Sequence, residues 1–190
     1  MKKKIYIETN IKKVKKVYKD NVYIRKFNES DISNKIKWIN DSANNKFLHY
    51  DLPLEYERTK KWYTKIKDRE DRFDGVIEYE NIPVGIIGLL NIDIQNQKAE
   101  YYITLGENEF KGKGIAYKAS IKILEYAFEQ LNLNKIYLYT EVENIIAQKL
   151  FDKLGFEKEG KLKEDLIINN KKKDRYIYAI FRRDWIKHSK

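Results

Sequence analysis

The 190-residue sequence contains no cysteine, only two prolines and two histidines, and no long apolar run. The absence of cysteine excludes a disulfide framework and a thiol nucleophile. His49 and His188 lie far apart in the sequence, so we expect no histidine-based metal cluster. No segment approaches the roughly 18 apolar residues of a membrane-spanning helix, and the lysine-rich start lacks the apolar region of a secretory signal. We therefore expect a cytoplasmic protein without a metal or a membrane segment.

The composition that is present fits one domain with a basic extension. Apolar residues make up 42% of the chain, which suffices for a core. The first 20 residues hold eight lysines against Glu8 and Asp20, a net of +6, so the remainder carries +4 of the total +10. A solvated arm accounts for this charge, and attraction of anionic ligands or nucleic acid is the alternative. We expect an N-terminal extension over 1–21, one domain over 22–185 and a tail over 186–190.

Hydrophobic periodicity predicts strands and helices from residue 22 onward. Ser30 is the predicted N-cap of the first helix, in which isoleucines recur at helical spacing. Asn144 is the predicted N-cap of the last helix, and Gly155 its left-handed C-terminal cap. The other two helices are predicted at about 54–67 and 115–131. The predicted strands are 22–27, 73–79, 84–93, 99–105, 135–140, 156–168 and 176–181.

A glycine-containing stretch, Phe110-Lys111-Gly112-Lys113-Gly114-Ile115-Ala116, joins the fourth predicted strand to the helix that follows. Glycine lets the backbone approach a ligand closely, and the first turn of a helix offers unpaired N–H groups at its positive dipole end. The stretch is therefore a candidate cradle for a pyrophosphate, with Lys111 and Lys113 adding positive charge. An ordinary turn is the alternative interpretation.

A second motif lies farther along the chain, Asn144-Ile145-Ile146-Ala147-Gln148-Lys149-Leu150-Phe151-Asp152-Lys153-Leu154-Gly155-Phe156. Together the two motifs resemble the acetyl-CoA-binding half of the GNAT superfamily of N-acetyltransferases, in its ribosomal-protein and spermidine acetyltransferase-like branch. The resemblance runs from about Val22 to Trp185. It implies an α/β fold with a mixed, mostly antiparallel twisted sheet and about four flanking helices. It also implies that the central strands, 99–105 and 135–140, splay apart.

The resemblance further implies which residues bind acetyl-CoA, the expected cosubstrate. The splayed strand would hold the pantetheine arm through its backbone and supply oxyanion donors, and the glycine loop would hold the pyrophosphate. The residues assigned to the cofactor are Ile103, Thr104, Leu105, Phe110, Lys111, Gly112, Lys113, Gly114, Ile115, Ala116, Asn144, Lys149 and Phe151.

Acetyl transfer to an amine requires that the amine lose its proton. Glu100 resembles the glutamate through which many members of the family act by way of water, and a structural glutamate is the alternative. Asn144 resembles the family's asparagine that contacts the cofactor or an ordered water, so Glu100 and Asn144 are the predicted catalytic residues. The predicted acceptor-binding residues are aromatic and border the family's acceptor site, although they can equally close the core: Trp38, Phe47, His49, Tyr50 and Tyr102.

Phe151 departs from the family pattern, because many relatives carry a tyrosine there that is taken as the proton donor to the thiolate. Phenylalanine cannot donate a proton. Either the proton comes from Tyr137, Tyr139, water or the departing ammonium, or the chain is a slow or inactive enzyme.

The sequence thus predicts an acetyl-CoA-dependent N-acetyltransferase that transfers directly to a primary amine of a small molecule. Candidate acceptors are an amino sugar, a nucleotide-linked amino sugar, a polyamine or a similar amine. A protein N-terminus, as in the ribosomal-protein type, is the alternative acceptor. A non-catalytic domain that binds acyl-CoA, or a basic domain that binds nucleic acid, is the alternative of another class. We expect no nucleic-acid or membrane partner, and a homodimer remains open.

Overall fold

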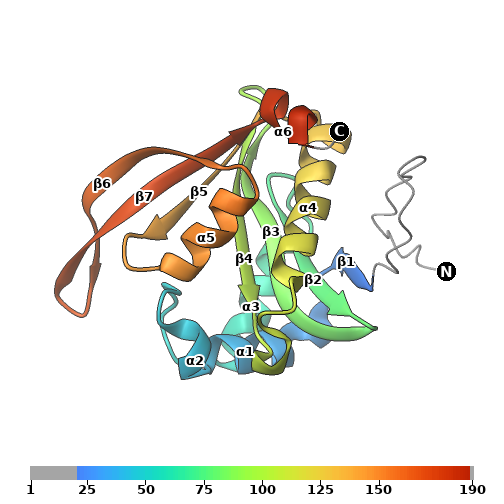
Figure 1. The fold of residues 1–190 in the computed structure, drawn as a ribbon. Coiled ribbons are helices and arrows are strands. Elements are labelled where there is room, and N and C mark those ends of the chain that lie inside the picture. Colours follow the sequence, from blue (N-terminus) through green and yellow to red (C-terminus); the bar gives the residue numbers. More distant parts are fainter. Residues whose placement is uncertain (1–20, 189–190) are drawn as a thin grey trace.

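The computed structural model describes residues 21–188, with side chains up to Trp185. The predicted basic extension therefore lies outside the described residues, apart from Asn21. The described chain forms a seven-stranded sheet with helices on both faces (Figure 1). The strands are β1 (Val22–Lys26), β2 (Phe73–Tyr79), β3 (Ile82–Asp93), β4 (Lys98–Leu105), β5 (Lys135–Glu141), β6 (Glu157–Ile168) and β7 (Lys171–Phe181). The helices are α1 (Ile32–Asn40), α2 (Ser42–Asn45), α3 (Tyr56–Ile66), α4 (Ile115–Glu125), α5 (Ile145–Lys153) and α6 (Arg182–His188).

The strand order is β1-β2-β3-β4-β5-β7-β6. Strands β1 to β4 form an antiparallel meander, β5 joins β4 in parallel, and β7 pairs antiparallel with both β5 and β6. The mixed, mostly antiparallel sheet predicted from the sequence is thereby confirmed. The β6–β7 hairpin extends well beyond the rest of the sheet in Figure 1.

The central strands β4 and β5 pair over three residues only, Lys98–Glu100 with Lys135–Tyr137. Beyond this point β4 continues to Leu105 beside β3, whereas β5 continues to Glu141 beside β7. The two strands diverge in Figure 1, so the predicted splay is confirmed. The edge of β4 from Tyr101 to Leu105 is left without a pairing strand among residues 21–188, and such an edge can hydrogen-bond an extended ligand as an added strand would.

The core lies on both faces of the sheet. On one face α4 packs against β1, β3 and β4 through its buried residues Ile115, Ala119 and Ile123, and Ala127 just after the helix continues this stripe. On the other face α1 packs against β3 and α3. A separate apolar cluster there consists of Phe27, Ile32, Trp38, Ile39, Val76 and Ile86. The diverging strands β4 and β5 therefore belong to a sheet that has helices packed on both of its faces.

Several local features differ from the sequence prediction. Ser30 does not cap α1 but lies within a 3-10 turn, Glu29–Asp31, that leads into the helix. Asn28 caps this turn: its side chain accepts from Ser30 N (2.9 Å), and the Asp31 carboxylate accepts from Asn28 N (2.9 Å). The 115–131 helix consists of α4 and a five-residue π-helical segment, Tyr126–Gln130. The predicted 169–174 turn shrinks to Asn169 and Asn170, which both have positive φ, as a tight hairpin turn requires.

Two short helices were not predicted. Helix α2 follows α1 directly, with Asp41 as its N-cap. Helix α6 runs to His188, so it crosses the boundary predicted at 185 between the domain and its C-terminal tail. The described residues thus contain six α-helices rather than the predicted four.

Candidate active site

The loop before α4 has the backbone geometry of an anion-binding turn. Gly112 and Gly114 both lie in the left-handed region, with φ of 77° and 75°. No atom lies within 4 Å of where a Cβ would stand at either position, so the loop is open on its outer side. Gly114 is the N-cap of α4 and has no side chain to satisfy the first N–H groups of the helix. Such N–H groups, at the positive end of the helix dipole, are suited to bind phosphate.

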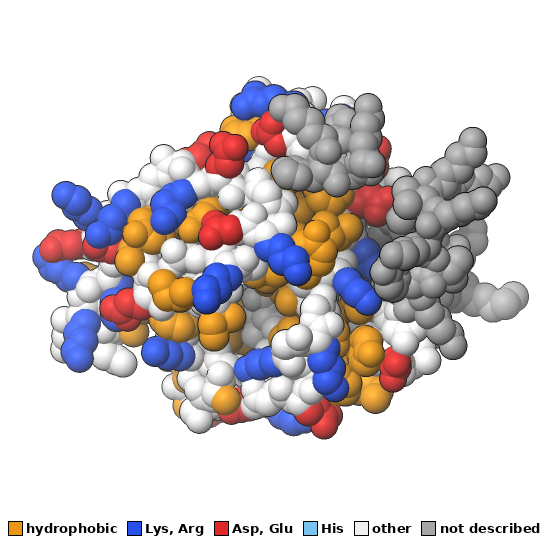
Figure 2. All heavy atoms as spheres, in the orientation of Figure 1, with side chains coloured by type: hydrophobic (Ala, Val, Ile, Leu, Met, Phe, Trp, Pro, Cys, Tyr) orange, Lys and Arg blue, Asp and Glu red, His pale blue; other side chains and the backbone are white. Residues whose placement is uncertain are grey.

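The lysine side chains of this loop contact other residues of the protein and do not all point into the loop. Lys111 Nζ donates to Asn44 Oδ1 (2.5 Å) and Asn108 Oδ1 (2.6 Å), so it ties the loop to α2. Lys113 Nζ lies 4.9 Å from the centroid of the Phe110 ring, and that ring packs on Tyr79. Lys149 is exposed on α5, and Lys and Arg side chains are spread over the face that carries α4 and α5 (Figure 2). This face therefore offers mobile positive charge near the loop rather than a preformed lysine clamp.

The loop continues directly into the buried start of α4. Ile115 is 1% exposed and belongs to the main core, which fixes the helix beneath the glycines. On the strand before the loop, Ile103, Thr104 and Leu105 are half-buried and lie on the open stretch of β4. The structure thus brings the predicted pantetheine strand and the predicted pyrophosphate loop together around the start of α4.

Glu100 lies at the vertex of the splay, on the last β4 residue that still pairs with β5. It is half-buried, and Asn91 Nδ2 donates to its Oε2 (3.0 Å). Its partner in register is Tyr137, whose pKa is raised by burial and further by the charge of Glu100. A carboxylate and a phenol therefore share the closed end of the gap.

The side chain of Tyr102 lies on the same face of the sheet as Glu100 and reaches across the neighbouring strand β3. Its hydroxyl donates to Asp74 Oδ1 on β2 (2.7 Å), although β3 lies between the two strands. Gly88 on β3 makes the crossing possible, because a Cβ there would stand 2.5 Å from the Tyr102 ring. Arg72 holds the Asp74 carboxylate with two hydrogen bonds of 2.6 and 2.7 Å. Burial, followed by the charge of Asp74, raises the pKa of Tyr102 well above its ordinary value, so this hydroxyl stays protonated.

A cavity of about 160 Å³ opens on this face between α1, α3 and the loop before α3. Lys35 lies in it with 5% exposure, its Nζ 3.7 Å from the centroid of the Trp62 ring. Burial lowers the pKa of Lys35 to about 8, against the attraction of Asp74. Tyr50 lines the same cavity, and Lys35 Nζ lies 5.3 Å from its ring centroid.

The other predicted acceptor residues have different surroundings. Trp38 has no exposed surface, and its Nε1 donates to Glu107 Oε1 (2.7 Å). Its ring lies so close to Gly106 that a Cβ there would stand 1.9 Å from it, so Trp38 braces the turn after β4 and has no surface for a substrate. Phe47 is half-buried in the loop after α2. His49 reaches from that loop to the end of β5, where its Nε2 lies 3.5 Å from Glu141 Oε1.

Asn144 caps α5 as predicted, its side chain accepting from Ala147 N (3.2 Å). Gly155 ends the helix with φ of 84°, which confirms the predicted left-handed cap. Phe151 points into the core with 6% exposure, and its ring packs against Tyr101, Phe156 and Tyr178. The helix start therefore borders the open end of the splay, whereas Phe151 is enclosed by aromatic rings.

Sequence reasoning missed Glu141 because it lies one residue beyond the predicted strand. The alternation along β5 places Tyr137, Tyr139 and Glu141 on one face, and the β4–β5 register makes this the face of Glu100. Extending the strand by one residue would have found it. The residues near Glu141, His49 and Lys173, come from distant segments of the chain, so no local sequence pattern could have predicted these contacts.

The open strand edge, the uncapped helix start and the carboxylate at the vertex are the parts that acyl transfer from a coenzyme A thioester requires. Residues 21–157 match the family model described as acetyltransferase (GNAT) domain, and the chain belongs to this family. It is therefore an N-acetyltransferase that uses acetyl-CoA. Among residues 21–188, the structure contains no group of three metal-ligating side chains and no helix long and apolar enough to span a membrane.

Two relatives and one solved structure describe the branch. The chain is 37% identical over 109 residues to a putative ribosomal N-acetyltransferase of Bacillus subtilis, covering 56% of this chain and 58% of that protein. It is 33% identical over 138 residues to a spermidine N(1)-acetyltransferase of Vibrio cholerae, covering 72% of this chain and 79% of that protein. The Vibrio cholerae spermidine N-acetyltransferase in complex with CoA and spermine superposes with a TM-score of 0.81 at 26% identity, covering 87% of this chain and 98% of that chain.

Proposed function

We propose that this protein transfers the acetyl group of acetyl-CoA directly to a primary amine of a small molecule, with a polyamine as the foremost acceptor. The observation that carries the proposal is the gap between β4 and β5. An anion-binding turn lies at one end of this gap, and the carboxylates Glu100 and Glu141 lie on one face of the sheet, which we call the acceptor face. Carboxylates on this face favour a cationic acceptor over a neutral or anionic one. The likeness to spermidine acetyltransferases supports the same acceptor class.

In this proposal the chain's residues divide the chemistry as follows. The N–H groups of the Gly112–Ala116 turn bind the pyrophosphate, and the backbone of Ile103 to Leu105 binds pantetheine and stabilises the oxyanion. Glu100 removes a proton from the acceptor ammonium, directly or through water. Asn144 orients the thioester end or a water beside it. No covalent enzyme intermediate is needed.

The leaving thiolate needs a proton source other than Phe151. Tyr139 fits this role better than the tyrosines that pack on Phe151, because it lies on β5 beyond the last β4–β5 pair, on the face of Glu100. Tyr101, by contrast, shares a 2.6 Å hydrogen bond with Ser120, and burial raises its pKa. Tyr139→Phe, compared with Tyr101→Phe, tests this assignment through kcat.

Acetylation of a protein N-terminus is the second candidate function, favoured by the likeness to the putative ribosomal N-acetyltransferase. A panel of acceptors separates the two. CoA release should be measured with spermidine, spermine, an amino sugar, a nucleotide-linked amino sugar and peptides that carry ribosomal-protein N-termini. The proposal expects the highest kcat/KM with the polyamines. Exclusive turnover of peptides would replace it with the second function, and CoA binding without release for any amine would make the protein a binding domain.

A further inference from the structure

Glu141 is a buried carboxylate with an unsatisfied oxygen on the acceptor face. The residue is 4% exposed, and no described residue hydrogen-bonds its Oε1. An ionised carboxylate in such a position is unfavourable unless it is paired and hydrogen-bonded. A buried polar group in this state calls for a partner outside the described residues, such as a water, an ion or a ligand.

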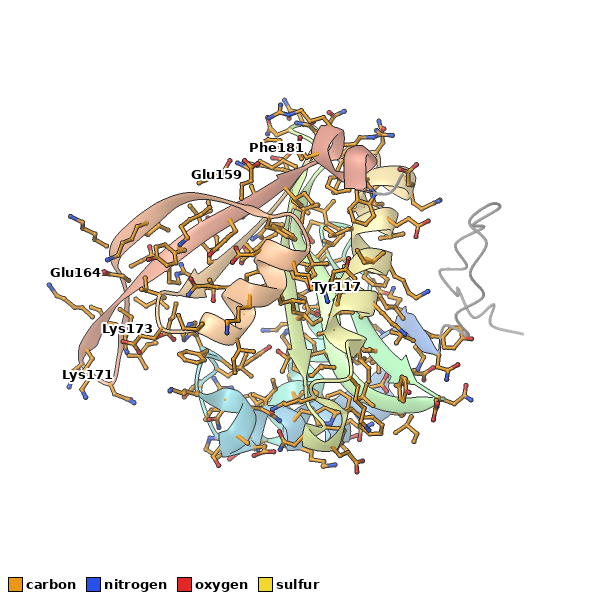
Figure 3. The ribbon with its side chains drawn as sticks, in the orientation of Figure 1. Tyr117, Glu159, Glu164, Lys171, Lys173 and Phe181 are labelled. Carbon is orange, nitrogen blue, oxygen red and sulfur yellow. The ribbon has the colours of Figure 1, made fainter. Side chains whose placement is uncertain are left out.

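The basic side chains near Glu141 leave its Oε1 without a hydrogen bond. His49 Nε2 lies 3.5 Å from Oε1, but burial lowers the pKa of His49 and Arg175 lowers it further, against the pull of Glu141. The ring is therefore largely uncharged at neutral pH. Lys173 Nζ lies 3.9 Å from Oε2 and is held by Glu143 at 2.8 Å. Lys173 lies on the β6–β7 hairpin (Figure 3), and the oxygen of Glu141 that it approaches is Oε2, whereas His49 approaches Oε1.

A hollow in the surface lies beside Glu141. Glu141 lines a hollow of about 210 Å³ together with Val142, Glu143, Lys172, Lys173 and Asp174. Its Oε1 is turned toward His49, which lies on the loop that borders the acceptor face. Because Oε1 has almost no accessible surface, a cationic group would reach it only by entering between this loop and β5.

The distance from Glu100 gives the length of the ligand. Glu141 lies four residues beyond Tyr137, the register partner of Glu100, and on the same face. At a rise of about 3.3 Å per residue, the two carboxylates are separated by roughly 13 Å along the strand. A molecule whose reactive amine lies at the vertex therefore meets Glu141 with a second cationic group several bonds away.

We propose that Glu141 is the specificity residue that binds a second, non-reacting ammonium of the acceptor and thereby selects long diamines and polyamines over monoamines. This inference rests on the proposed function, since it concerns the acceptor of the same reaction. One charge-assisted hydrogen bond at a desolvated site corresponds to roughly 10- to 100-fold in affinity.

The test compares matched amines on the intact protein. Wild type should show a kcat/KM for diaminooctane roughly 10- to 100-fold above that for octylamine, and little preference for diaminopropane over propylamine, whose short chains cannot span the two carboxylates. Glu141→Gln should abolish the diaminooctane preference, because KM for diaminooctane should rise far more than KM for octylamine. The matched control is Asp174→Asn, a carboxylate in the same hollow that pairs with Lys161 and not with Lys173, which should keep the preference.

Each outcome decides the proposal. Equal kcat/KM for diaminooctane and octylamine in wild type would overturn it without any variant, as would a Glu141→Gln enzyme that keeps the diamine preference. If Glu141→Gln does not fold, Glu141→Asp keeps the charge with a shorter reach and should retain a reduced preference; an unreduced one counts against the assignment. Absence of transfer to every amine would overturn the proposed function itself, whereas turnover without chain-length discrimination would overturn only the role of Glu141.

Discussion

Replacing Gly112 by aspartate tests the phosphate-binding role of the loop before α4. Gly112 has φ of 77° and open space around its Cβ position, so a side chain there meets no steric clash. The left-handed backbone costs a non-glycine residue about 1–2 kcal/mol, with Asp and Asn at the low end. The domain should therefore fold with a modest loss of stability.

The effect on cofactor binding follows from charge. At about 6 Å and an effective dielectric of 20, two unit charges repel by roughly 3 kcal/mol, and screening by water reduces this toward 1 kcal/mol. The aspartate should thus raise KM for acetyl-CoA by about 5- to 100-fold. Gly112→Asn is the matched control, because it has the same size and backbone strain without the charge, and it should show a much smaller rise.

The assay is steady-state CoA release with acetyl-CoA varied, supported by calorimetric titration of CoA into each variant. Thermal unfolding of both variants establishes that they are folded. If Gly112→Asp and Gly112→Asn bind CoA equally well, the charge at this position does not meet a phosphate. The pyrophosphate would then have to bind elsewhere, and the loop would be a turn without a ligand role.

Four further predictions concern other parts of the chain. Glu100→Gln should lower kcat by about 100- to 10,000-fold, with partial rescue at higher pH as free amine becomes available; wild-type kcat across pH would leave Glu100 a structural residue. Phe151→Tyr should leave kcat equal or higher, and a loss of kcat in a folded variant would contradict this. A chain that begins at Asn21 should fold and bind CoA as judged by titration, whereas insolubility would show that the extension belongs to the domain. Lys35→Met should raise the free energy of unfolding at pH 7 by up to about 3 kcal/mol, less the lost contact with Trp62, because burial lowers the pKa of Lys35 to about 8. Urea unfolding should show this gain vanish between about pH 8 and 10.5, because the unfolded chain loses its extra proton there. A gain that stays constant with pH would refute the prediction.

The parts of the fold that depend on local pattern were predictable from the sequence. Strand β2 was predicted with the bounds that the structure has, and the caps of α5 at Asn144 and Gly155 follow from residue chemistry alone. The glycine turn before α4 was visible because only glycine takes up its two left-handed positions without strain. The splay between β4 and β5 came from family resemblance, since no spacing in either strand reveals where pairing stops.

The acceptor face was harder to predict because its residues meet only through tertiary packing. Trp38 and Tyr50 are neighbours of the same polar turn in the sequence, yet one is fully buried and the other lines a cavity. The contact between His49 and Glu141 joins segments far apart in the chain. The crossing of Tyr102 to Asp74 depends on a glycine in the strand between them. None of these arrangements leaves a periodic signal in the sequence.

A two-substrate initial-rate study, with acetyl-CoA and spermidine both varied, tests most directly whether the acetyl group passes from acetyl-CoA to a small amine held in the same site. Direct transfer predicts amine-dependent CoA release, intersecting double-reciprocal lines and one acetylated amine per CoA released. Parallel lines would indicate an acetylated enzyme intermediate and contradict direct transfer. CoA release that does not depend on the amine would contradict the proposed function.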